Sequence, residues 1–365
     1  MKKFADVFKR LVSPVSLVLL IVASVSAVLL LIGRHSVAFA EWVTVKIGHP
    51  IRYALAALTD PIAPSIGEIL LCACPVIFVA VIILAAKRRG WMQRLRFLIS
   101  LVSVLSLLFG GYVYTLGIGY HRENIASRMD IKSVNVTEEN LYSTLVFLAE
   151  RCSELVPELE FGDSGSSVNG SDLYSICEQV CLGYSRLAED YPEMGLETFD
   201  SLAKPVGMSE LMTQLELLGV YSFFTGEANV NVHYPDYTLP FTVAHEFAHQ
   251  RGIARENEAN FIAHLVCIRS DDPYVRYSGY MNMFEYVASA LAKTNKELVQ
   301  TVYAELDAAL IGEMKAYSKF YYDNKNEFLA NLSDLVNDNY LKAQGTEGIV
   351  SYGLVVRLAV AYYSN

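Results

Sequence analysis

The sequence predicts a mainly α-helical membrane protein, with three transmembrane helices at its amino terminus and a larger water-soluble domain after them. Three observations support this prediction. The 365 residues are 53% apolar, which is high for a soluble domain. Three apolar runs of spanning length all lie within the first third of the chain. After Tyr120, apolar residues recur mostly at helical spacing among polar ones.

Each apolar run has the length of a helix that crosses a bilayer, about 20 residues. The runs are residues 15–32, 66–86 and 97–118, and Glu68 is the one charged residue in them. A cleaved signal peptide is the alternative for the first run, but no clear small-residue cleavage site follows it, so we expect an uncleaved anchor. The chain therefore divides into a membrane domain and an outer domain, residues 1–120 and 121–365.

Lysine and arginine near the ends of the spans predict the orientation, because these residues are retained on the cytoplasmic side. Four of them precede the first span, and five lie in the short connection at residues 87–96. The longer loop at residues 33–65 holds only three. We therefore expect a multi-pass plasma-membrane protein whose amino terminus is cytoplasmic and whose carboxy-terminal domain is extracytoplasmic.

Charge narrows the range of partners. Residues 121–365 carry 17 Lys and Arg against 35 Asp and Glu, a net charge of −18. A surface of this charge repels polyanions, so we expect no nucleic-acid partner. The spans make the lipid bilayer a partner, and the sequence leaves the oligomeric state open.

The outer domain is expected to consist mostly of helices. Thr137 can cap a helix that begins with two acidic residues and runs to about Leu155. The stretch FGDSGSSVNGSD, residues 161–172, predicts a flexible loop. Further helices are predicted at about residues 171–189 and 209–220, and from Tyr280 to the end of the chain wherever apolar residues recur every three or four positions.

One segment has the pattern of a strand instead. In TGEANVNVHYP, residues 225–235, small or apolar side chains alternate with polar ones. This period of two predicts a strand over residues 228–234 that has one face in the core and one polar face. The polar face carries Asn229, Asn231 and His233.

The densest group of potential metal ligands lies in TVAHEFAHQRGIARENEAN, which contains the HExxH sequence of His245, Glu246 and His249. Pro240 suits the first turn of a helix there, and Gly252 suits its end. Residues four apart on a helix have their Cβ atoms about 5–6 Å apart on one face, so both imidazoles can bind one zinc ion. Glu246 lies beside them, where it can hold a metal-bound water and take its proton.

A catalytic zinc ion takes a third protein ligand and keeps one position open. The segment after Gly252 offers Glu256 and Glu258, and spacing alone allows either. We favour Glu256, because Asn260 lies four residues later and can hold a histidine ring through its other nitrogen. Chance is the alternative for the whole motif, since a chain of this composition contains an accidental HExxH at a frequency of about one in a hundred.

These residues resemble the gluzincin metallopeptidases, a group of zincins in which a glutamate on a later helix is the third zinc ligand. Asn260 stands where those enzymes usually have an aspartate. Separated motifs over nearly the whole chain also resemble a bacterial membrane family known as domain of unknown function 3810. The motifs are FFTGEANVNV, LPFTVAHEFAHQRGIARENEANFIAHLVC, YSGYMNMFEYV and NDNYLKAQGTEGIVSYGLVVRLAVAYY. The resemblance implies an α+β zincin-like outer domain with a small edge-strand sheet.

In zincins an edge strand lies antiparallel to the bound peptide. The resemblance assigns this role to residues 228–234, so that Asn229, Asn231 and His233 would contact substrate. A strand packed only on its own domain is the alternative. The donor to the oxyanion stays open among four side chains, His233, Tyr221, Tyr277 and Tyr280.

The function expected from these features is that of a membrane-anchored zinc metallopeptidase, which hydrolyses peptide bonds outside the cytoplasm with Glu246 as general base. The substrate would be a peptide or protein, and the cofactor Zn²⁺. Two alternatives are a catalytically silent zincin-fold module that binds or senses at the cell surface, and a zinc amidase that acts on cell-wall peptides. The presence of Glu246 favours catalysis, because a binding module has no need of it.

Overall fold

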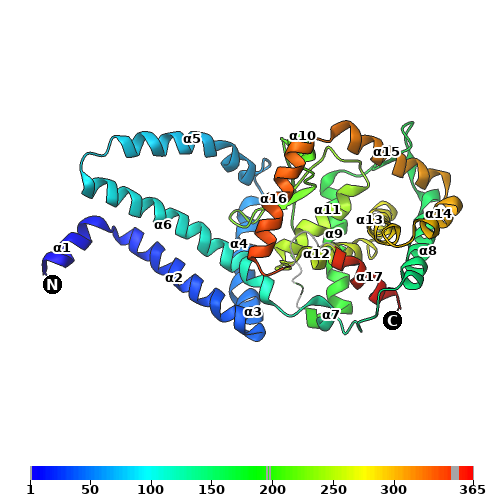
Figure 1. Ribbon diagram of the computed structural model, residues 1–365, viewed down its shortest axis with the longest axis horizontal. Coiled ribbons are helices and arrows are strands. Elements are labelled where there is room, and N and C mark those ends of the chain that lie inside the picture. Colours follow the sequence, from blue (N-terminus) through cyan, green and yellow to red (C-terminus); the bar gives the residue numbers. More distant parts are fainter. Residues whose placement is uncertain (1, 195, 197–198, 347–352, 365) are drawn as a thin grey trace.

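The computed structural model describes residues 2–194, 196, 199–346 and 353–364. Figure 1 shows a mainly helical molecule in two parts: long amino-terminal helices project from a rounded domain that holds the rest of the described chain. The prediction of a mainly α protein with three amino-terminal candidate spans is confirmed.

Three helices are long and apolar enough to cross a membrane: α2 (Pro14–His35), α5 (Ile66–Ala86) and α6 (Trp91–Thr115). The third begins six residues earlier than its apolar run, because Arg94 and Arg96 lie within its first turns. Helices α2 and α6 pack against each other, and Gly110 lets the backbone of α6 approach Ser26 of α2. Among the residues of α5, only Gly67 is buried.

The loop between the first two spans is itself helical, which its composition did not predict. It contains α3 (Val37–Val43), the π-helical turn η1 (Thr44–Gly48) and α4 (His49–Thr59). Arg52 of α4 is fully buried and donates to the carbonyl oxygens of Thr115 and Thr44, at 3.3 and 3.2 Å. The loop is therefore packed into the molecule and joins the end of α6.

Charged side chains connect the start of α5 to the outer domain. The Glu227 carboxylate accepts hydrogen bonds from the backbone N–H groups of Ile66 and Gly67, at 2.9 and 2.8 Å, which are free donors at a helix start. In return, Glu68 of α5 accepts from the N–H groups of Gly207 and Met208. These reciprocal bonds hold the amino-terminal end of α5 against the outer domain.

Two further short helices lead from α6 into the outer domain, the 3-10 helix η2 (Gly117–His121) and α7 (Ile125–Arg128). The other helices of the domain are α8 (Glu138–Leu155), α9 (Leu173–Asp190), α10 (Ser209–Gln214), α11 (Thr238–Gln250), α12 (Glu256–Cys267), α13 (Pro273–Ala292), α14 (Lys296–Glu305), α15 (Ala308–Asn324), α16 (Glu327–Ala343) and α17 (Leu354–Ser364), with short 3-10 turns at Val156–Glu158 and Pro192–Met194. Thr137 caps α8 as predicted, in a reciprocal capping box with Asn140. Helices α11 and α12 lie inside the core, and α9 and α13 pack against them.

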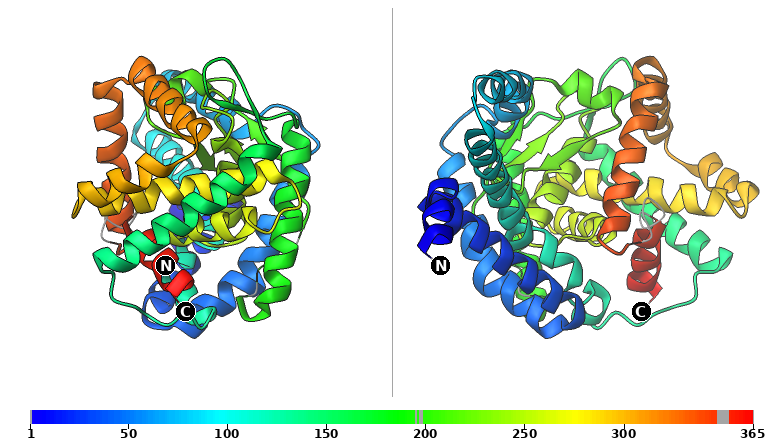
Figure 2. Two further views of the ribbon diagram at one scale, coloured as in Figure 1. Left: turned by 90° about the vertical axis from the view of Figure 1, so that its right-hand side faces the viewer. Right: turned by 60° about the vertical axis from the view of Figure 1, so that its left-hand side comes forward.

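The strands form two small sheets. The hairpin of β1 (Glu160–Phe161) and β2 (Ser167–Val168) begins one residue before the segment predicted as a flexible loop, residues 161–172, and otherwise lies within it. The second sheet has the order β3-β5-β4, in which β3 (Ala203–Pro205) runs parallel to β5 (Ala228–Val230) and β4 (Gly219–Tyr221) runs antiparallel to it. Figure 2 (right) shows this sheet between the membrane helices and α16.

Two secondary-structure predictions are wrong, one for a strand and one for a helix. Strand β5 is the central strand and ends at Val230, because Asn231 turns toward α10 and donates to Thr213 and to the carbonyl oxygen of Leu217. The helix predicted over residues 209–220 ends at Gln214, since residues 219–221 pair with β5 as strand β4. The edge strand of this sheet that follows α10 is therefore β4.

Candidate metal centre

Helices α11 and α12 bring the predicted ligands together. His245 and His249 lie one turn apart on α11, and Pro240 lies in its first turn. Gly252 follows with φ +85°, a left-handed conformation that suits glycine and ends the helix. Helix α12 begins at Glu256, so its first residue points back toward the two imidazoles.

Two arginines contact the turn between these helices, Arg52 of the first loop and Arg122, which directly follows η2. Arg122 donates from Nη1 to the carbonyl oxygen of Gly252 at 3.1 Å, and its guanidinium also binds Glu41 of α3. Arg52 lies so close that a Cβ atom at Gly252 would be 2.7 Å from its Nη2. The spacing of His249 and Glu256 therefore depends on residues in the first loop.

Three side chains could hold one metal ion. The Nε2 atoms of His245 and His249 are 3.1 Å apart, and the Glu256 carboxylate oxygens lie 3.2 Å from the first and 3.6 Å from the second. A tetrahedral zinc ion with bonds of about 2.0–2.1 Å requires ligand atoms roughly 3.3–3.4 Å apart. The donor set, two imidazole nitrogens and one carboxylate, and its spacing both fit zinc.

The other nitrogens of the two rings fix their tautomers. His245 Nδ1 lies 2.8 Å from Asn260 Oδ1, and His249 Nδ1 lies 2.8 Å from the carbonyl oxygen of Ile253. Both partners are acceptors, so each Nδ1 carries the proton and donates. The Nε2 lone pairs then face each other, an arrangement that requires a cation or a proton between them.

Burial and charge set the proton affinity of this group without a metal. Burial lowers the pKa of His249, but the Glu256 carboxylate and the Glu246 carboxylate raise it more, to about 9. Burial raises the pKa of Glu256, while the two imidazoles hold it well below its usual range. In the metal-free chain a proton on His249 therefore occupies the place of the ion.

Zinc binding near pH 7.5 is accordingly expected to release about one proton per chain, because His249 must be neutral to bind the ion. Since its pKa is raised from 6.5 to about 9, apparent zinc affinity should rise about tenfold per pH unit up to pH 9 and then level off. Calorimetric titration in two buffers of different ionisation enthalpy measures the released proton. Equal heats in both buffers would contradict the protonated state of His249.

Glu246 lies between the histidines and β4. Its side chain is buried, with 3% exposed, and accepts a hydrogen bond from the backbone N–H of Tyr221. Its Oε2 atom has no partner among the described residues. Burial raises the pKa of this carboxyl, and the two imidazoles only partly offset that effect. A Cβ atom at Gly219 would overlap the Glu246 carboxylate, so a side chain at this position of β4 would displace Glu246.

The Asn260 contact gives a testable effect on metal affinity. Replacement of Asn260 by alanine removes the acceptor of His245 Nδ1 and frees the ring to rotate. Loss of such an outer hydrogen bond typically weakens metal binding by about 10–100-fold, and we expect that range here. Competition with a fluorescent zinc chelator measures the change. Asn260→Asp, which restores an acceptor, should recover most of the affinity, and an Asn260→Ala chain with unchanged affinity would contradict the role of Asn260.

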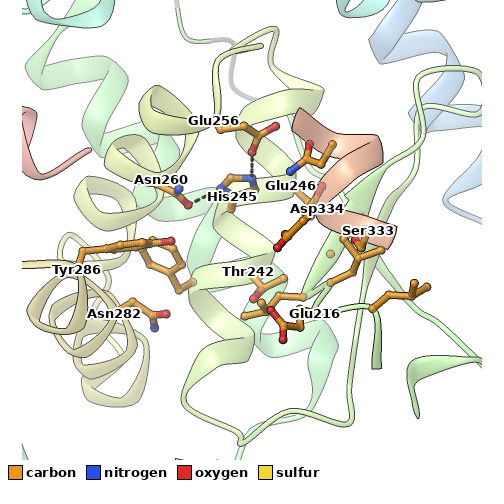
Figure 3. A pocket seen from close by; sticks show the side chains of 16 residues that line it. Glu216, Thr242, His245, Glu246, Glu256, Asn260, Asn282, Tyr286, Ser333 and Asp334 are labelled. Carbon is orange, nitrogen blue, oxygen red and sulfur yellow. Dashed lines mark hydrogen bonds and ion pairs between the residues drawn. The ribbon is translucent and has the colours of Figure 1, made fainter. Parts of the chain in front are cut away.

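The three candidate ligands lie in a cleft formed by two adjoining pockets, of about 330 and 610 Å³. His245, Glu246 and Glu256 line both of them. The walls are strand β4 with the residues before it and helix α16, which contributes Ser333 and Asn337 to both pockets. Figure 3 shows Asp334 and Ser333 beside His245 and Glu246, with Tyr286 and Asn282 farther along the pocket.

The two ends of the cleft differ in chemistry. The smaller pocket is lined by Glu216 and Asp334 and by no lysine or arginine among the described residues. The larger pocket is mainly apolar and reaches Tyr112 and Leu116 at the end of α6. The cleft therefore runs from an acidic end to an apolar end that adjoins the membrane helices.

Glu258, the other candidate third ligand, lies outside the cluster. Its carboxylate accepts from Arg255 at 2.8 Å and from the backbone N–H of Ile125 at 3.2 Å. Among the described residues, the group whose ligand atoms converge consists of His245, His249 and Glu256.

The residues predicted to contact substrate do not line the cleft. Asn229 donates to the carbonyl oxygen of Val220 within the sheet. Asn231 and His233 both contact Thr213 of α10, and the His233 ring packs on Phe320. Asn231 and His233 thus point toward α10, and Asn229 bonds within the sheet. The alternating pattern of this segment therefore arises from the packing of the sheet and the loop after it.

The four candidate oxyanion donors are also dispersed. The Tyr277 hydroxyl donates to Glu313, and Tyr280 packs on His264. Tyr221 alone of the four lines the cleft, and its ring lies against His249. The prediction missed Tyr286, which lines the acidic pocket together with Asn260. Its place in the motif YSGYMNMFEYV was the only signal in the sequence.

Comparison with known proteins places this site within a family. The model of the family described as Protein of unknown function (DUF3810) matches residues 46–360. The chain belongs to this family. The DUF3810 match includes the second and third spans, the histidines, Glu256 and all of α16. A search of curated proteins found no match to the chain, and a search of solved structures found none.

Proposed function

We propose that this DUF3810 protein is a zinc metallopeptidase anchored in the plasma membrane, with a zincin-like outer domain that hydrolyses peptide bonds outside the cytoplasm. The observation that carries the proposal is the convergence of His245, His249 and Glu256, whose ligand atoms lie within 4.8 Å of one another. Glu246 lies beside this group at the wall of an open cleft. A binding module gives no reason for a buried carboxylate at that place.

Each of these side chains can have one role in amide hydrolysis. Zinc, when bound by the three ligands, supplies a Lewis acid and lowers the pKa of a water molecule toward about 7. Glu246 accepts the proton of the attacking water at Oε2, which has no partner among the described residues. The Tyr221 N–H fixes the other side of the carboxylate. Glu246 then delivers the proton to the leaving amine, and Tyr286 and Tyr221 are two candidate donors to the oxyanion among the tyrosines of the cleft wall.

The outer edge of strand β4, beside Glu246, favours a peptide substrate. The backbone groups of Leu218 and Ser222 bond toward the β5 side. Because backbone groups alternate along a strand, Gly219 and Tyr221 direct theirs to the opposite side, into the cleft. The Tyr221 N–H is bound to Glu246, so Gly219 and the Tyr221 carbonyl oxygen are the groups that a peptide can bind. An extended peptide can pair with this edge through its main chain, with little dependence on its sequence.

The arrangement of the spans supports the extracytoplasmic location. The connection between α5 and α6 carries Lys87, Arg88 and Arg89 and lies at the end of these helices that is remote from the outer domain (Figure 1). Basic residues in short connections are retained in the cytoplasm. The outer domain would then lie on the opposite side of the membrane.

The proposal is tested with the full chain in detergent micelles or lipid nanodiscs. We expect about one zinc ion per chain by elemental analysis, the number for a single site. A library of unstructured peptides should be cut by the zinc-loaded protein, not by the chelated protein, and again after zinc is returned. Cell-wall muropeptides form a separate arm, and cleavage confined to them would assign the amidase activity instead. If the zinc-loaded protein cuts neither the peptides nor the muropeptides, the proposed hydrolase activity is wrong, and the alternative function of a non-catalytic binding module remains.

A further inference from the structure

The start of α5 forms one wall of a third cavity, of about 320 Å³, that adjoins the cleft. Gly67 and Leu71 of α5 lie on one side, and Met208 and Leu211 lie on the other. This cavity and the apolar pocket of the cleft share five lining residues: Leu215, Leu217, Val220, Tyr221 and Phe223. A mainly apolar path therefore leads from a candidate span to Glu246 and His249.

The spans leave this path open toward lipid. Helices α2 and α6 pack along each other, whereas α5 makes no comparable contact with either of them. Figure 1 shows that α5 and α6 meet at their connection and diverge toward the outer domain. Leu71 is 63% exposed. Bilayer lipid would thus reach the cavity between the diverging ends of α5 and α6.

Helix α16 continues the apolar surface on the other side of the cleft. Leu332 and Val336 line the apolar pocket and are 45% and 61% exposed. Leu335, on the same helix, is 60% exposed. An exposed apolar group of this kind at a cleft marks a surface that binds an apolar partner.

Strand β4 sets the distance from the membrane to the candidate ligands. Gly219 lies against Glu246, and the segment then runs to Phe223, whose carbonyl oxygen accepts from Thr115 at the end of α6. The Phe223 ring packs edge-on against Tyr112. Strand β4 ends at Tyr221 and a turn carries the chain to Phe223, so these four residues place the site at most about 13 Å from the end of the span.

The direction of β4 also gives the substrate a polarity. The chain of β4 runs from the ligands toward the membrane, so an antiparallel partner has its amino-terminal residues nearest the membrane. Antiparallel pairing is the more stable arrangement per residue. Beyond the ligands, Glu216 and Asp334 give the far pocket a negative charge that suits basic residues.

We infer that the substrate is a polypeptide with an apolar anchor in the outer leaflet on the amino-terminal side of the cleaved bond. The anchor lies between the outer ends of α5 and α6, and the next residues follow β4 to the ligands. The cut falls within about four to six residues of the anchor, the length of extended chain that spans the distance from α6. This inference rests on the proposed peptidase activity and adds its substrate class.

The experiment uses the full chain in lipid vesicles and one peptide with a basic residue after the cleaved bond. The peptide is presented free, with an amino-terminal palmitoyl chain, with an amino-terminal transmembrane helix, and with a carboxy-terminal palmitoyl chain. A fifth form carries a flexible Gly/Ser spacer of about 15 residues between the amino-terminal anchor and the cleavable sequence.

We expect at least one amino-terminally anchored form to be cut roughly tenfold faster or more than the carboxy-terminally anchored form. The two palmitoylated forms reach the same concentration on the vesicle surface. A difference between their cleavage rates therefore reports how the peptide enters the cleft and in which direction its chain runs. Comparison of the palmitoylated form with the form that carries a transmembrane helix shows whether the natural anchor is an acyl chain or a helix. The form with the spacer should either be cut close to its anchor or be cut no faster than the carboxy-terminally anchored form.

A second measurement does not depend on turnover. The Glu246→Gln chain is mixed with the palmitoylated peptide bearing a photoreactive group on its acyl chain. Crosslinks should map to α5 near Leu71 and to α6 near Leu116, and crosslinks confined to α2 would overturn the inference. Equal cleavage of the two palmitoylated forms would overturn it too, while the peptidase activity stands. Failure of every form to be cut, with zinc bound, would count against the proposed activity itself.

Discussion

Replacement of Glu246 by glutamine is expected to lower turnover by about 10²–10⁴-fold and to leave the bound zinc in place. Glutamine has the same shape and keeps an oxygen for the Tyr221 N–H. It cannot accept the proton of the attacking water, which is the role assigned to Oε2. Turnover of a cleaved peptide and the zinc content of the same preparation are the two measurements.

Glu258→Gln is the matched control for this prediction, because it makes the same chemical change at another buried carboxylate, on α12. It lies outside the ligand cluster, so turnover per folded chain should stay within about threefold of wild type, as expected for a side chain that does not touch the reaction. Because this change weakens the contact with Arg255, thermal unfolding measures the folded fraction, and turnover is expressed per folded chain. Equal turnover of wild type and Glu246→Gln, both with zinc bound, would refute the assignment of the general base.

Replacement of Glu256 by alanine is expected to abolish stable zinc binding. The carboxylate lies 3.2 and 3.6 Å from the two Nε2 atoms, so its loss removes one of three protein ligands and the negative charge of the group. The effect should exceed the roughly 10–100-fold loss that follows removal of an outer hydrogen-bond partner. The zinc content after dialysis against a weak chelator measures the loss of zinc binding. Thermal unfolding with and without zinc shows how much the metal stabilises the fold.

Glu258→Ala separates the two glutamates that the sequence left open. Its carboxylate binds Arg255 and Ile125, so the variant should lose some stability and keep about one zinc ion per chain, as a single intact site does. The opposite result, with zinc retained by Glu256→Ala and lost by Glu258→Ala, would reverse the proposed ligand set.

Local patterns account for what the sequence predicted well. The spans were located because a bilayer imposes a long apolar run, and α5 has the predicted bounds. His245 and His249 were predicted to face one point because residues four apart on a helix share a face. The contact between Asn260 and His245 also follows from spacing, since Asn260 lies one turn after Glu256 on α12.

The walls of the cleft were not predictable in the same way. Strand β4 is three residues long, and its pairing with β5 depends on contacts that composition does not encode. Asp334 reaches the site from almost 90 residues farther along the chain, and Tyr112 reaches it from a span. The alternation in residues 228–234 misled the prediction, because a buried polar face in a loop has the same period as a substrate-facing edge.

The clamp of Arg52 and Arg122 on the turn at Gly252 bears on the biosynthesis of the protein. A ribosome completes the first loop long before it makes α11 and α12, but these parts can meet only on one side of the membrane. A nascent chain whose carboxy-terminal half is still in the cytosol would lack the contact of Arg52 with this turn and the ion pair that holds Arg122 to Glu41 of the first loop. Under the proposed topology, translocation would then complete the candidate metal site, and the proposed activity would be absent in the cytosol.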